Sequence, residues 1–344
     1  MENRLQKLPW ALLPWYDNHK RDLPWRRDRD AYHVWLSEIM LQQTRVEAVK
    51  GYYSRFLAAL PDVASLANAD DELLHKLWEG LGYYSRVRNL KKAARVVMDA
   101  HGGVFPKEYD NVRALPGIGD YTAGAICSIC YDLPTPAVDG NVLRVIARIT
   151  ADDTPIDLPA YKKAVALELA AIYPKEAGNF TQALMELGAT VCAPNGKPKC
   201  ENCPCAHLCL AYEKQIQQML PARLPKRRRR KEEKTVFILS CGDSFALRKR
   251  NEKGLLAGLW QFPEVSGKLE LDAALDAVRK MGLPVREVYR QADRKHIFTH
   301  IEWEMRGFYM EVGEMNDSFT WLTQWQIEEN AALPTAFRQF WEIK

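Results

Sequence analysis

Residues 115–139 read LPGIGDYTAGAICSICYDLPTPAVD, and this stretch decides how the first half of the chain folds. A Pro-Gly-Ile-Gly turn precedes small and apolar residues that predict a helix from about Asp120, and a proline-rich loop then ends at Asp139. Because Gly117 and Gly119 lack a Cβ, the backbone there can take a positive φ and approach a ligand closely. The N–H groups at the start of the helix predict an anion site. Such turns also serve as plain connections between helices, so the turn alone does not decide between these interpretations.

Length and composition favour a globular protein of two or three domains, since the chain has 344 residues, 47% of them hydrophobic and 27% charged. No apolar run reaches the roughly 18 residues that span a bilayer, so we expect no membrane association. Lys and Arg number 48 against 44 Asp and Glu, and their local concentration indicates that the expected anion belongs to a polymer. The N-terminal sequence shows no signal-peptide pattern, which predicts a cytoplasmic location where the eight cysteines stay reduced.

Three regions follow from the residue patterns. Residues 1–212 predict a helical domain, in which VRNLKKAARVVMDAHG is an amphipathic helix that stops at Gly102 and Gly103. Residues 213–234 predict a linker, because two prolines precede a KRRRRK block of like charge that cannot pack; such a block is as often a solvated linker as a nucleic-acid contact. Residues 235–344 predict a mixed α and β domain, with strand-like TVFILSC, FALRKR and IFTHIEWEMRGFYMEV and the helical DAALDAVRKMG.

Four cysteines close the helical domain with the spacing C-x7-C-x2-C-x5-C, namely Cys192, Cys200, Cys203 and Cys209. Cys205 is an extra thiol inside the same loop. Four thiolates bind either a structural zinc ion or an iron–sulfur cluster, and the spacing leaves both open. Cys127, Cys130 and Cys241 are interpreted as small core residues.

Two carboxylates are candidates for catalysis. In YHVWLSEIMLQQTRV a helix places Glu38 on one face with Val34, Trp35 and Leu41, so that desolvation raises the pKa of this carboxyl and suits it to be a general acid. The alternative is a glutamate on the rim of an amphipathic helix. Asp139 is equally an N-cap of the helix that GNVLRVIARI predicts. A pair of carboxylates in separate segments is what cleavage of a glycosidic bond requires.

The combination of SEIMLQQTRV, GLGYYSRVRNL, LPGIGDYTAGAI, AVDGNVLRV and the cysteine cluster resembles the helix-hairpin-helix DNA glycosylases that carry an iron–sulfur cluster. Within them the chain is similar to the MutY-type adenine DNA glycosylases, which remove adenine mispaired with 8-oxoguanine. The resemblance covers essentially the whole chain. It implies a multidomain protein: an all-α helix-hairpin-helix module with a cluster loop, followed by an α/β Nudix-like domain.

The resemblance also implies roles for individual residues. It makes Glu38 the acid that protonates adenine and Asp139 the carboxylate that faces the sugar cation, with Tyr121 beside it. It implies a [4Fe–4S] cluster on Cys192, Cys200, Cys203 and Cys209, in a loop that brings Lys197 and Lys199 to phosphates. The DNA-binding positions that it implies are Gln43 and Tyr83 in the base stack, Arg26 and Gln182 in the adenine pocket, and the turn glycines Gly117 and Gly119.

The chain departs from the related endonuclease III branch, in which a lysine after the turn attacks the sugar as an amine. Asp120, Tyr121 and Thr122 occupy that place here, so we expect a monofunctional glycosylase that releases the base without cutting the strand. The first cysteine interval is one residue longer than is usual in the family, which makes Cys205 a possible alternative ligand.

The C-terminal domain resembles the Nudix fold, most visibly at GLLAGLWQFPE. The stretch LDAALDAVRKMGL lacks the paired glutamates that bind metal in Nudix hydrolases, so we expect no hydrolase activity. The segment HIFTH matches the loop by which the family senses 8-oxoguanine, which makes Phe298, Thr299 and His300 candidate readers of the damaged base.

The expected protein is therefore a bacterial, cytoplasmic and nucleoid-associated monomer that acts on double-stranded DNA containing adenine opposite 8-oxoguanine or guanine. Two alternatives remain open at this point. One is an endonuclease III-like glycosylase and lyase for oxidised pyrimidines, which the missing lysine disfavours. The other is a non-catalytic DNA-binding adaptor with a zinc knuckle, which would have no use for Glu38 on an apolar face.

Overall fold

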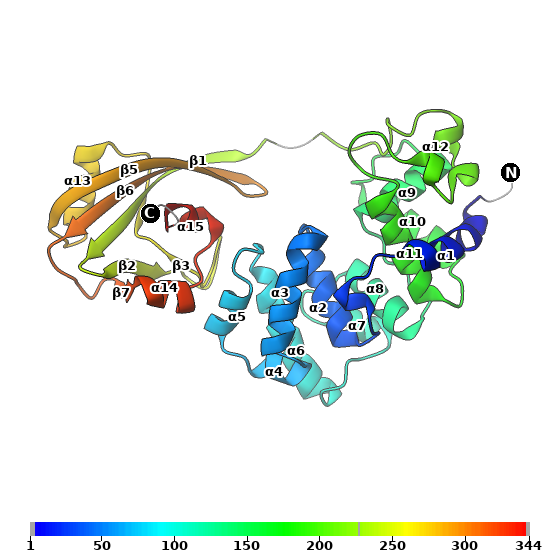
Figure 1. Ribbon diagram of the computed structural model, residues 1–344, viewed down its shortest axis with the longest axis horizontal. Helices are drawn as coiled ribbons and strands as arrows, with labels where there is room; N and C mark the ends of the chain where they lie inside the picture. Colours follow the sequence, from blue (N-terminus) through cyan, green and yellow to red (C-terminus); the bar gives the residue numbers. More distant parts are fainter. Residues whose placement is uncertain (1–3, 226–227, 342–344) are drawn as a thin grey trace. The chain divides into compact units, whose positions relative to one another are not determined.

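The computed structural model describes residues 4–225 and 228–341, which form two compact units (Figure 1). The helical unit contains the chain up to Asn68 together with Arg88–Pro225. The second unit combines Ala69–Val87 with the chain that follows Pro225. No helix of the described residues is long and apolar enough to cross a membrane.

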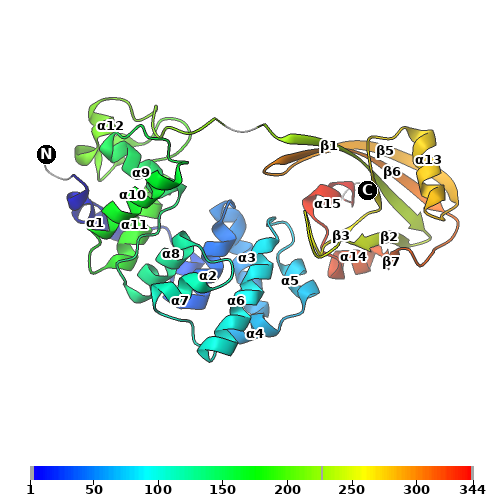
Figure 2. The ribbon, with the colours of Figure 1, turned by 180° about the vertical axis from the view of Figure 1, so that it is seen from behind.

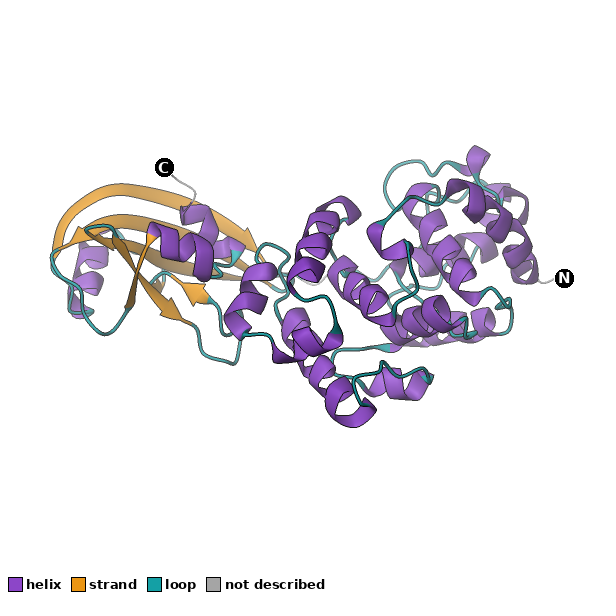
Figure 3. Cartoon of the chain, turned by 60° about the horizontal axis from the view of Figure 1, so that its bottom comes forward, coloured by secondary structure: helices purple, strands orange, loops and turns teal. Residues whose placement is uncertain are grey.

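The helical unit is built from short helices around a buried core (Figure 3). Tyr16, Ile146 and Phe180 are typical members of that core, which α1, α9 and α11 share. The helices are η1 (Arg4–Lys7), α1 (Leu8–His19), η2 (Pro24–Arg26), α2 (Ala31–Leu41), α3 (Val46–Ala59), α4 (Val63–Asn68), α6 (Ser85–His101, which begins in the second unit), α7 (Tyr109–Ala114), α8 (Asp120–Tyr131), α9 (Gly140–Thr150), α10 (Pro159–Ala170), α11 (Ala177–Thr190), η3 (Cys200–Asn202), η4 (Ala206–Leu208) and α12 (Leu210–Glu213).

Helix α8 is the buried centre of this unit, because it packs against both α2 and α11. Its sequence DYTAGAICSICY offers small side chains over most of its length, and residues from Thr122 to Ile129 are buried. At Gly124 an added Cβ would lie 2.2 Å from the carbonyl oxygen of Pro136. Only glycine therefore lets the loop that leads to Asp139 lie directly on α8.

The turn between α7 and α8 joins two helices, as expected for the helix-hairpin-helix that the sequence predicted. The helix begins at Asp120 as expected, and Gly117 has the expected positive φ of 79°. The expectation of a positive φ at Gly119 is wrong: its φ is −98°, an extended conformation that other residues also adopt. An ion pair between Arg113 and Asp120, 2.5 Å apart, fastens the end of the turn.

The second unit is built on a mixed sheet with strand order β3-β2-β1-β6-β5, in which β4 pairs with β1 and β7 pairs with β2. Strands β1 and β6 run parallel, and β5 and β6 form a long antiparallel hairpin. The strands are β1 (Arg230–Cys241), β2 (Ser244–Lys249), β3 (Trp260–Gln261), β4 (Glu264–Ser266), β5 (Val285–Ile297), β6 (Ile301–Val312) and β7 (Thr320–Thr323).

Both faces of this sheet are covered (Figure 2). Val236 and Ile238 of β1 face one core, to which α14 (Gln324–Asn330) and α15 (Thr335–Trp341) contribute. Phe237 and Leu239 face the other core, with α13 (Leu271–Lys280). The alternation follows from the two-residue period of a strand, with apolar side chains at both phases because both faces are buried.

A segment from the first half of the sequence packs with this unit through α5 (Asp71–Leu77) and the loop that follows it. Glu79 accepts hydrogen bonds from the backbone N–H of Leu333 at 2.9 Å and from Arg338 Nη1 at 2.7 Å. Glu72 accepts a hydrogen bond from the indole N–H of Trp260 at 3.2 Å. The segment that contains Tyr83 is therefore held by the part of the second unit that follows Pro225.

The basic block is more ordered than the sequence indicated. Residues 226–227 lie outside the described residues, but Arg230 and Lys231 open strand β1. Lys231 pairs with Glu304 at 3.2 Å on the neighbouring strand β6, and Arg230 pairs with Glu232. The expectation that this run cannot pack is wrong for its second half, because acidic residues on the sheet balance its charge.

Candidate active site

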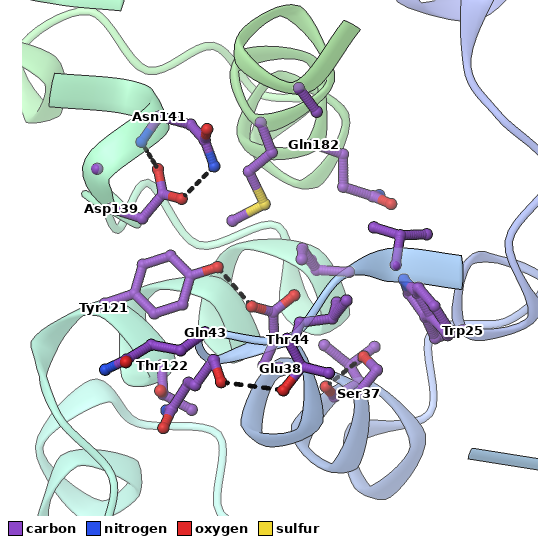
Figure 4. Close-up of a pocket in the computed structure, with 18 of the residues that line it drawn as sticks. Trp25, Ser37, Glu38, Gln43, Thr44, Tyr121, Thr122, Asp139, Asn141 and Gln182 are labelled. Atoms are coloured by element: carbon purple, nitrogen blue, oxygen red, sulfur yellow. Dashed lines mark hydrogen bonds between the residues drawn. The ribbon is translucent and has the colours of Figure 1, made fainter. Parts of the chain in front are cut away.

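A cavity of about 720 Å³ opens in the helical unit between α2, α8, the start of α9 and α11 (Figure 4). Its size suits a ligand as large as a nucleobase with its sugar. The residues that line it include many of those that the sequence singled out: Arg26, Glu38, Gln43, Gly117, Gly119, Tyr121, Asp139 and Gln182.

Glu38 lies on α2 and is only 5% exposed, as the apolar pattern of its helix predicted. Burial raises the pKa of Glu38 to about 7, and the nearby charge of Asp139 adds to this. Two groups oppose the rise: the Tyr121 hydroxyl, which donates a hydrogen bond to Glu38 Oε2 at 2.5 Å, and the charge of Arg26. The expected burial and raised pKa are confirmed, and the group can hold a proton at neutral pH.

Asp139 is the N-cap of α9 and lines the cavity as well. Its Oδ1 accepts hydrogen bonds from the backbone N–H groups of Asn141 at 2.9 Å and Val142 at 2.8 Å, and Oδ2 accepts from Asn141 Nδ2 at 2.7 Å. Burial raises the pKa of Asp139, while these three hydrogen bonds oppose the rise. The capping role and the candidate catalytic role thus fall on the same carboxylate.

A chain of hydrogen bonds, which the sequence analysis missed, fixes the Asp139 carboxylate from behind. Asn141 Oδ1 accepts from Arg144 Nη2 at 2.9 Å, and Arg144 Nε donates to the backbone carbonyl of Cys192 at 2.8 Å. Arg144 is buried. The backbone carbonyl of Cys192, the first cysteine of the cluster at 192–209, is therefore connected to the Asp139 carboxylate through the side chains of Arg144 and Asn141. The only signal for this chain of hydrogen bonds in the sequence was the spacing of two polar residues in AVDGNVLRV, since Arg144 follows Asn141 by three positions.

Arg26 lies on another wall of the cavity, in η2. Its Nη2 donates to Glu186 Oε2 at 2.7 Å, and its guanidinium lies 5.6 Å from the ring centre of Tyr16. Arg21, which also lines the cavity, binds the same carboxylate through Nε at 2.6 Å and Nη2 at 3.0 Å. The sequence analysis identified Arg26 but neither Arg21 nor Glu186, because more than 150 residues separate the partners.

Gln43 and Tyr83 share an unusual backbone. Both are exposed non-glycine residues in the left-handed region, with φ of 58° and 48°. Such conformations cost free energy and concentrate at functional sites. Gln182, by contrast, lies in regular helix α11 with its side chain toward the cavity (Figure 4).

Phe298, Thr299 and His300 form the turn between β5 and β6 in the second unit. Phe298 N donates to the Ile301 carbonyl at 2.8 Å, and the Phe298 ring packs between His296 and Trp303, with centroid distances of 4.5 and 4.8 Å. Thr299 and His300 are exposed. The hydroxyls of Thr299 and Tyr83 share a hydrogen bond at 2.9 Å, so the structure brings together two of the residues that the sequence assigned to recognition.

The thiols of the cysteine cluster at residues 192–209 line a separate pocket. Cys192, Cys200, Cys203, Cys205 and Cys209 all line it, together with the apolar Val145, Ile149 and Leu187. Arg148 Nη1 donates to Cys192 Sγ at 3.2 Å. In the part of the chain that the structure describes, no group of three or more His, Cys, Asp or Glu side chains is arranged to hold a metal ion. The extra residue in the first interval lies in an exposed loop at 194–196.

Comparison with protein families defines the class. Residues 36–168 match the family model described as HhH-GPD superfamily base excision DNA repair protein, and residues 235–343 match that of the NUDIX domain. A solved structure described as a thermostable thymine-DNA glycosylase superposes with a TM-score of 0.55 at 30% identity, over 62% of this chain and 98% of that one. A trapped endonuclease III–DNA complex shares the fold, with a TM-score of 0.52 at 23% identity over 63% of this chain and all of that one.

Relatives in sequence give the particular family. The chain is 36% identical to the adenine DNA glycosylase of Rattus norvegicus, over 96% of this chain and 77% of the relative. It is 34% identical to the human adenine DNA glycosylase over 97% of this chain and 73% of the relative, and 32% identical to that of Buchnera aphidicola from Acyrthosiphon pisum over 84% and 82%. The chain belongs to the adenine DNA glycosylase family. It is a DNA N-glycosylase of base excision repair, which confirms the resemblance and the fold class read from the sequence.

The raised pKa of Glu38 predicts a pH-dependent cost to stability. The folded protein keeps a proton on Glu38 that the unfolded chain, with a pKa of 4.5, releases. This contribution is complete below about pH 4.5 and is lost as the pH rises through about 7. For Glu38→Gln, which does not titrate, the free energy of unfolding relative to wild type should therefore increase by about 2.5 kcal/mol between pH 5 and pH 8.

Urea unfolding at several pH values measures this difference. The matched control is Glu47→Gln on α3, an exposed glutamate paired with Lys50 at 3.0 Å, for which the difference from wild type should stay flat. Parallel stability curves for wild type and Glu38→Gln would contradict the prediction.

Proposed function

We propose that the protein removes adenine that is paired with 8-oxoguanine or guanine in double-stranded DNA, by acid-assisted hydrolysis of the N-glycosidic bond. The observation that carries the proposal is the pair of carboxyls in one cavity, Glu38 with its raised pKa and Asp139 with its three hydrogen bonds. The family membership indicates that the nucleobase removed is adenine. The two carboxyls provide the groups that acid-assisted hydrolysis requires.

In the proposed mechanism the adenosine leaves the helix stack and enters the cavity, since the glycosidic bond is out of reach inside a duplex. Glu38 transfers its proton to the base, which becomes a neutral leaving group, and the Tyr121 hydroxyl orients the Glu38 carboxyl through the 2.5 Å hydrogen bond. Arg26 and Gln182, which line the same cavity, contact the base.

Asp139 faces the sugar, where positive charge develops as the bond breaks. Its carboxylate is held by backbone N–H groups and by Asn141, so little reorganisation is needed when the cation forms. Water completes the reaction and leaves an abasic site. No lysine follows the turn at 117–119, so the proposed enzyme forms no Schiff base there and leaves the strand intact.

The proposal also assigns the DNA contacts. The turn with Gly117 and Gly119 presents the N-terminus of α8, which no side chain caps, to a phosphate. Gln43 and Tyr83 enter the base stack from their strained turns, and Phe298, Thr299 and His300 read 8-oxoguanine. The hydrogen bond between Tyr83 and Thr299 supports a joint role in recognition. We propose a monomer that acts in the bacterial cytoplasm, at the nucleoid.

The family resemblance implies a [4Fe–4S] cluster, and the donor set fits it. Cys192, Cys200, Cys203 and Cys209 line one pocket closed by apolar side chains, with Arg148 donating to Cys192. Four thiolates are the ligands that such a cluster takes. Base excision requires no electron transfer, so the role proposed for the bound cluster is structural. It would hold the loop at 192–209 in position, and with it Lys197 and Lys199.

Glu38→Gln should lower the single-turnover rate of adenine release by about 100-fold or more, the usual contribution of a general acid, while mismatched DNA is still bound. The assay uses duplexes with adenine opposite 8-oxoguanine, guanine, cytosine or thymine, with and without hot alkali. Wild type should cut only after alkali and only with the first two partners. Glu47→Gln should match wild type.

Cutting without alkali would favour the lyase alternative, and no base release by wild type would favour the binding adaptor. Near-normal adenine release by Glu38→Gln would show that Glu38 is not the acid.

The purified protein should be yellow-brown and contain about four iron and four sulfide per chain, measured by visible absorbance and chemical analysis. Cys203→Ser should lose the colour, whereas Cys205→Ser should keep it. A colourless protein with one equivalent of zinc would contradict the cluster, and loss of colour in Cys205→Ser alone would show that Cys205 replaces a proposed ligand.

The double variant Phe298→Ala/His300→Ala should lose preference for 8-oxoguanine over guanine by roughly 5- to 150-fold, the effect of lost contacts worth about 1 to 3 kcal/mol. Its single-turnover rate with adenine opposite guanine should change little. Lys280→Ala, at the exposed end of α13, is the control. An unchanged preference in the double variant would remove the turn from damage recognition.

A further inference from the structure

Glu186 is a carboxylate with no exposed surface in the middle of α11. A buried charge is costly unless it is paired and hydrogen-bonded. Here both carboxylate oxygens are used, because Arg21 binds them in a bidentate manner at 2.6 and 3.0 Å and Arg26 adds a third bond at 2.7 Å. Burial alone would raise the pKa of Glu186, but these bonds and the charge of Arg26 outweigh it and hold the pKa below its ordinary value.

Both guanidinium groups that Glu186 holds belong to the lining of the cavity, whereas Glu186 itself does not. Arg26 is fixed from further directions: Nη1 donates to the Arg21 carbonyl at 3.4 Å, and the ring of Tyr16 lies against its guanidinium. Its side chain is 12% exposed, against 35% for Arg21. The ion pairs with Glu186 thus hold the Arg26 guanidinium in a fixed position at the cavity. Glu186 itself does not line the cavity.

We propose that Glu186 is a positioning residue of the adenine pocket: it fixes Arg26 against the base and compensates one of the two arginine charges that line the same cavity as Glu38. The inference rests on the proposed function, since it concerns the same cavity. Two guanidinium charges and one carboxylate leave this wall with a net charge of +1, which becomes +2 without the Glu186 charge.

The charge on this wall matters because Arg26 acts on Glu38. Its positive charge opposes the rise in the Glu38 pKa, so a more positive wall favours the deprotonated acid. The substitutions at Glu186 and Arg21 leave in place the other titratable groups that face Glu38 or line the cavity around it. These groups are Asp120, Tyr121 and Cys130 of α8, Asp139 at the start of α9, and Lys162 of α10.

Glu186→Gln therefore gives two measurable effects. The alkaline limb of the single-turnover rate against pH, above which Glu38 has lost its proton, should move down by about half a pH unit or more. Below that limb the rate should fall about 3- to 10-fold, because a glutamine oxygen cannot hold both guanidinium groups and Arg26 loosens.

Arg21→Gln gives a test in the opposite direction, at a more exposed position that tolerates the change. It lowers the wall charge to zero, so the limb should move to higher pH. The double variant Glu186→Gln/Arg21→Gln restores the charge of +1, and its limb should return toward that of wild type although its plateau rate stays reduced. A residue that only supported packing would produce neither the opposite shift nor the return.

The experiment measures these pH profiles on duplexes with adenine opposite 8-oxoguanine, using the full chain. Glu168→Gln, an exposed glutamate on α10, removes the same charge from the helical unit and should leave the profile unchanged. If wild type releases no adenine, the proposed function fails. If wild type is active but Glu186→Gln keeps its limb, or Arg21→Gln fails to raise it, the role of Glu186 is overturned.

Discussion

The site depends on one carboxyl, Glu38, that is only 5% exposed although it lines an open cavity. Helix α2 supplies the apolar surroundings, and α8 supplies Tyr121, whose hydroxyl is the hydrogen-bond donor to Glu38. An isolated charge in such a place would be costly, so the group remains protonated to near pH 7. The small residues of α8 follow from this constraint. They let α2, α11 and the loop before Asp139 converge on the same cavity.

The parts that hold the two carboxyls differ in kind. Glu38 is placed by packing and by a single neutral donor, whereas Asp139 is placed by a polar network that continues through Asn141 and Arg144 to the backbone of Cys192. Packing tolerates small shifts, but a network of directed bonds fixes an orientation. The loop of the cysteine cluster therefore contributes to the geometry of the Asp139 carboxylate from outside the cavity.

Local patterns in the sequence were sufficient for much of this site, and distant pairings were not. The start of α8, the stop of α6 at Gly102 and the burial of Glu38 follow from helix periodicity and capping. The sequence does not show that Glu186 meets Arg21 and Arg26 across more than 150 residues. Strand β5 was missed because its residues are mostly exposed and polar, and IFTHIEWEMRGFYMEV was assigned to one strand although residues 298–300 form the turn that separates β5 from β6. Gly119, with a φ of −98°, shows that a glycine in a turn does not by itself predict a positive φ.

The different surroundings of the two carboxyls also suit them to the two tasks of the proposed mechanism. Burial raises the pKa of both, but Asp139 receives three N–H hydrogen bonds and lies at the N-terminus of α9, where a negative charge is stabilised. Glu38 receives one hydroxyl bond, and the charge of Asp139 further favours its protonated form. These hydrogen bonds favour the charged form of Asp139, whereas burial and the charge of Asp139 favour the protonated form of Glu38. In the proposed mechanism the cavity then offers a protonated acid to the base and a carboxylate to the sugar, and in the proposed role of Glu186 the charge on the arginine wall shifts the pH at which Glu38 loses its proton.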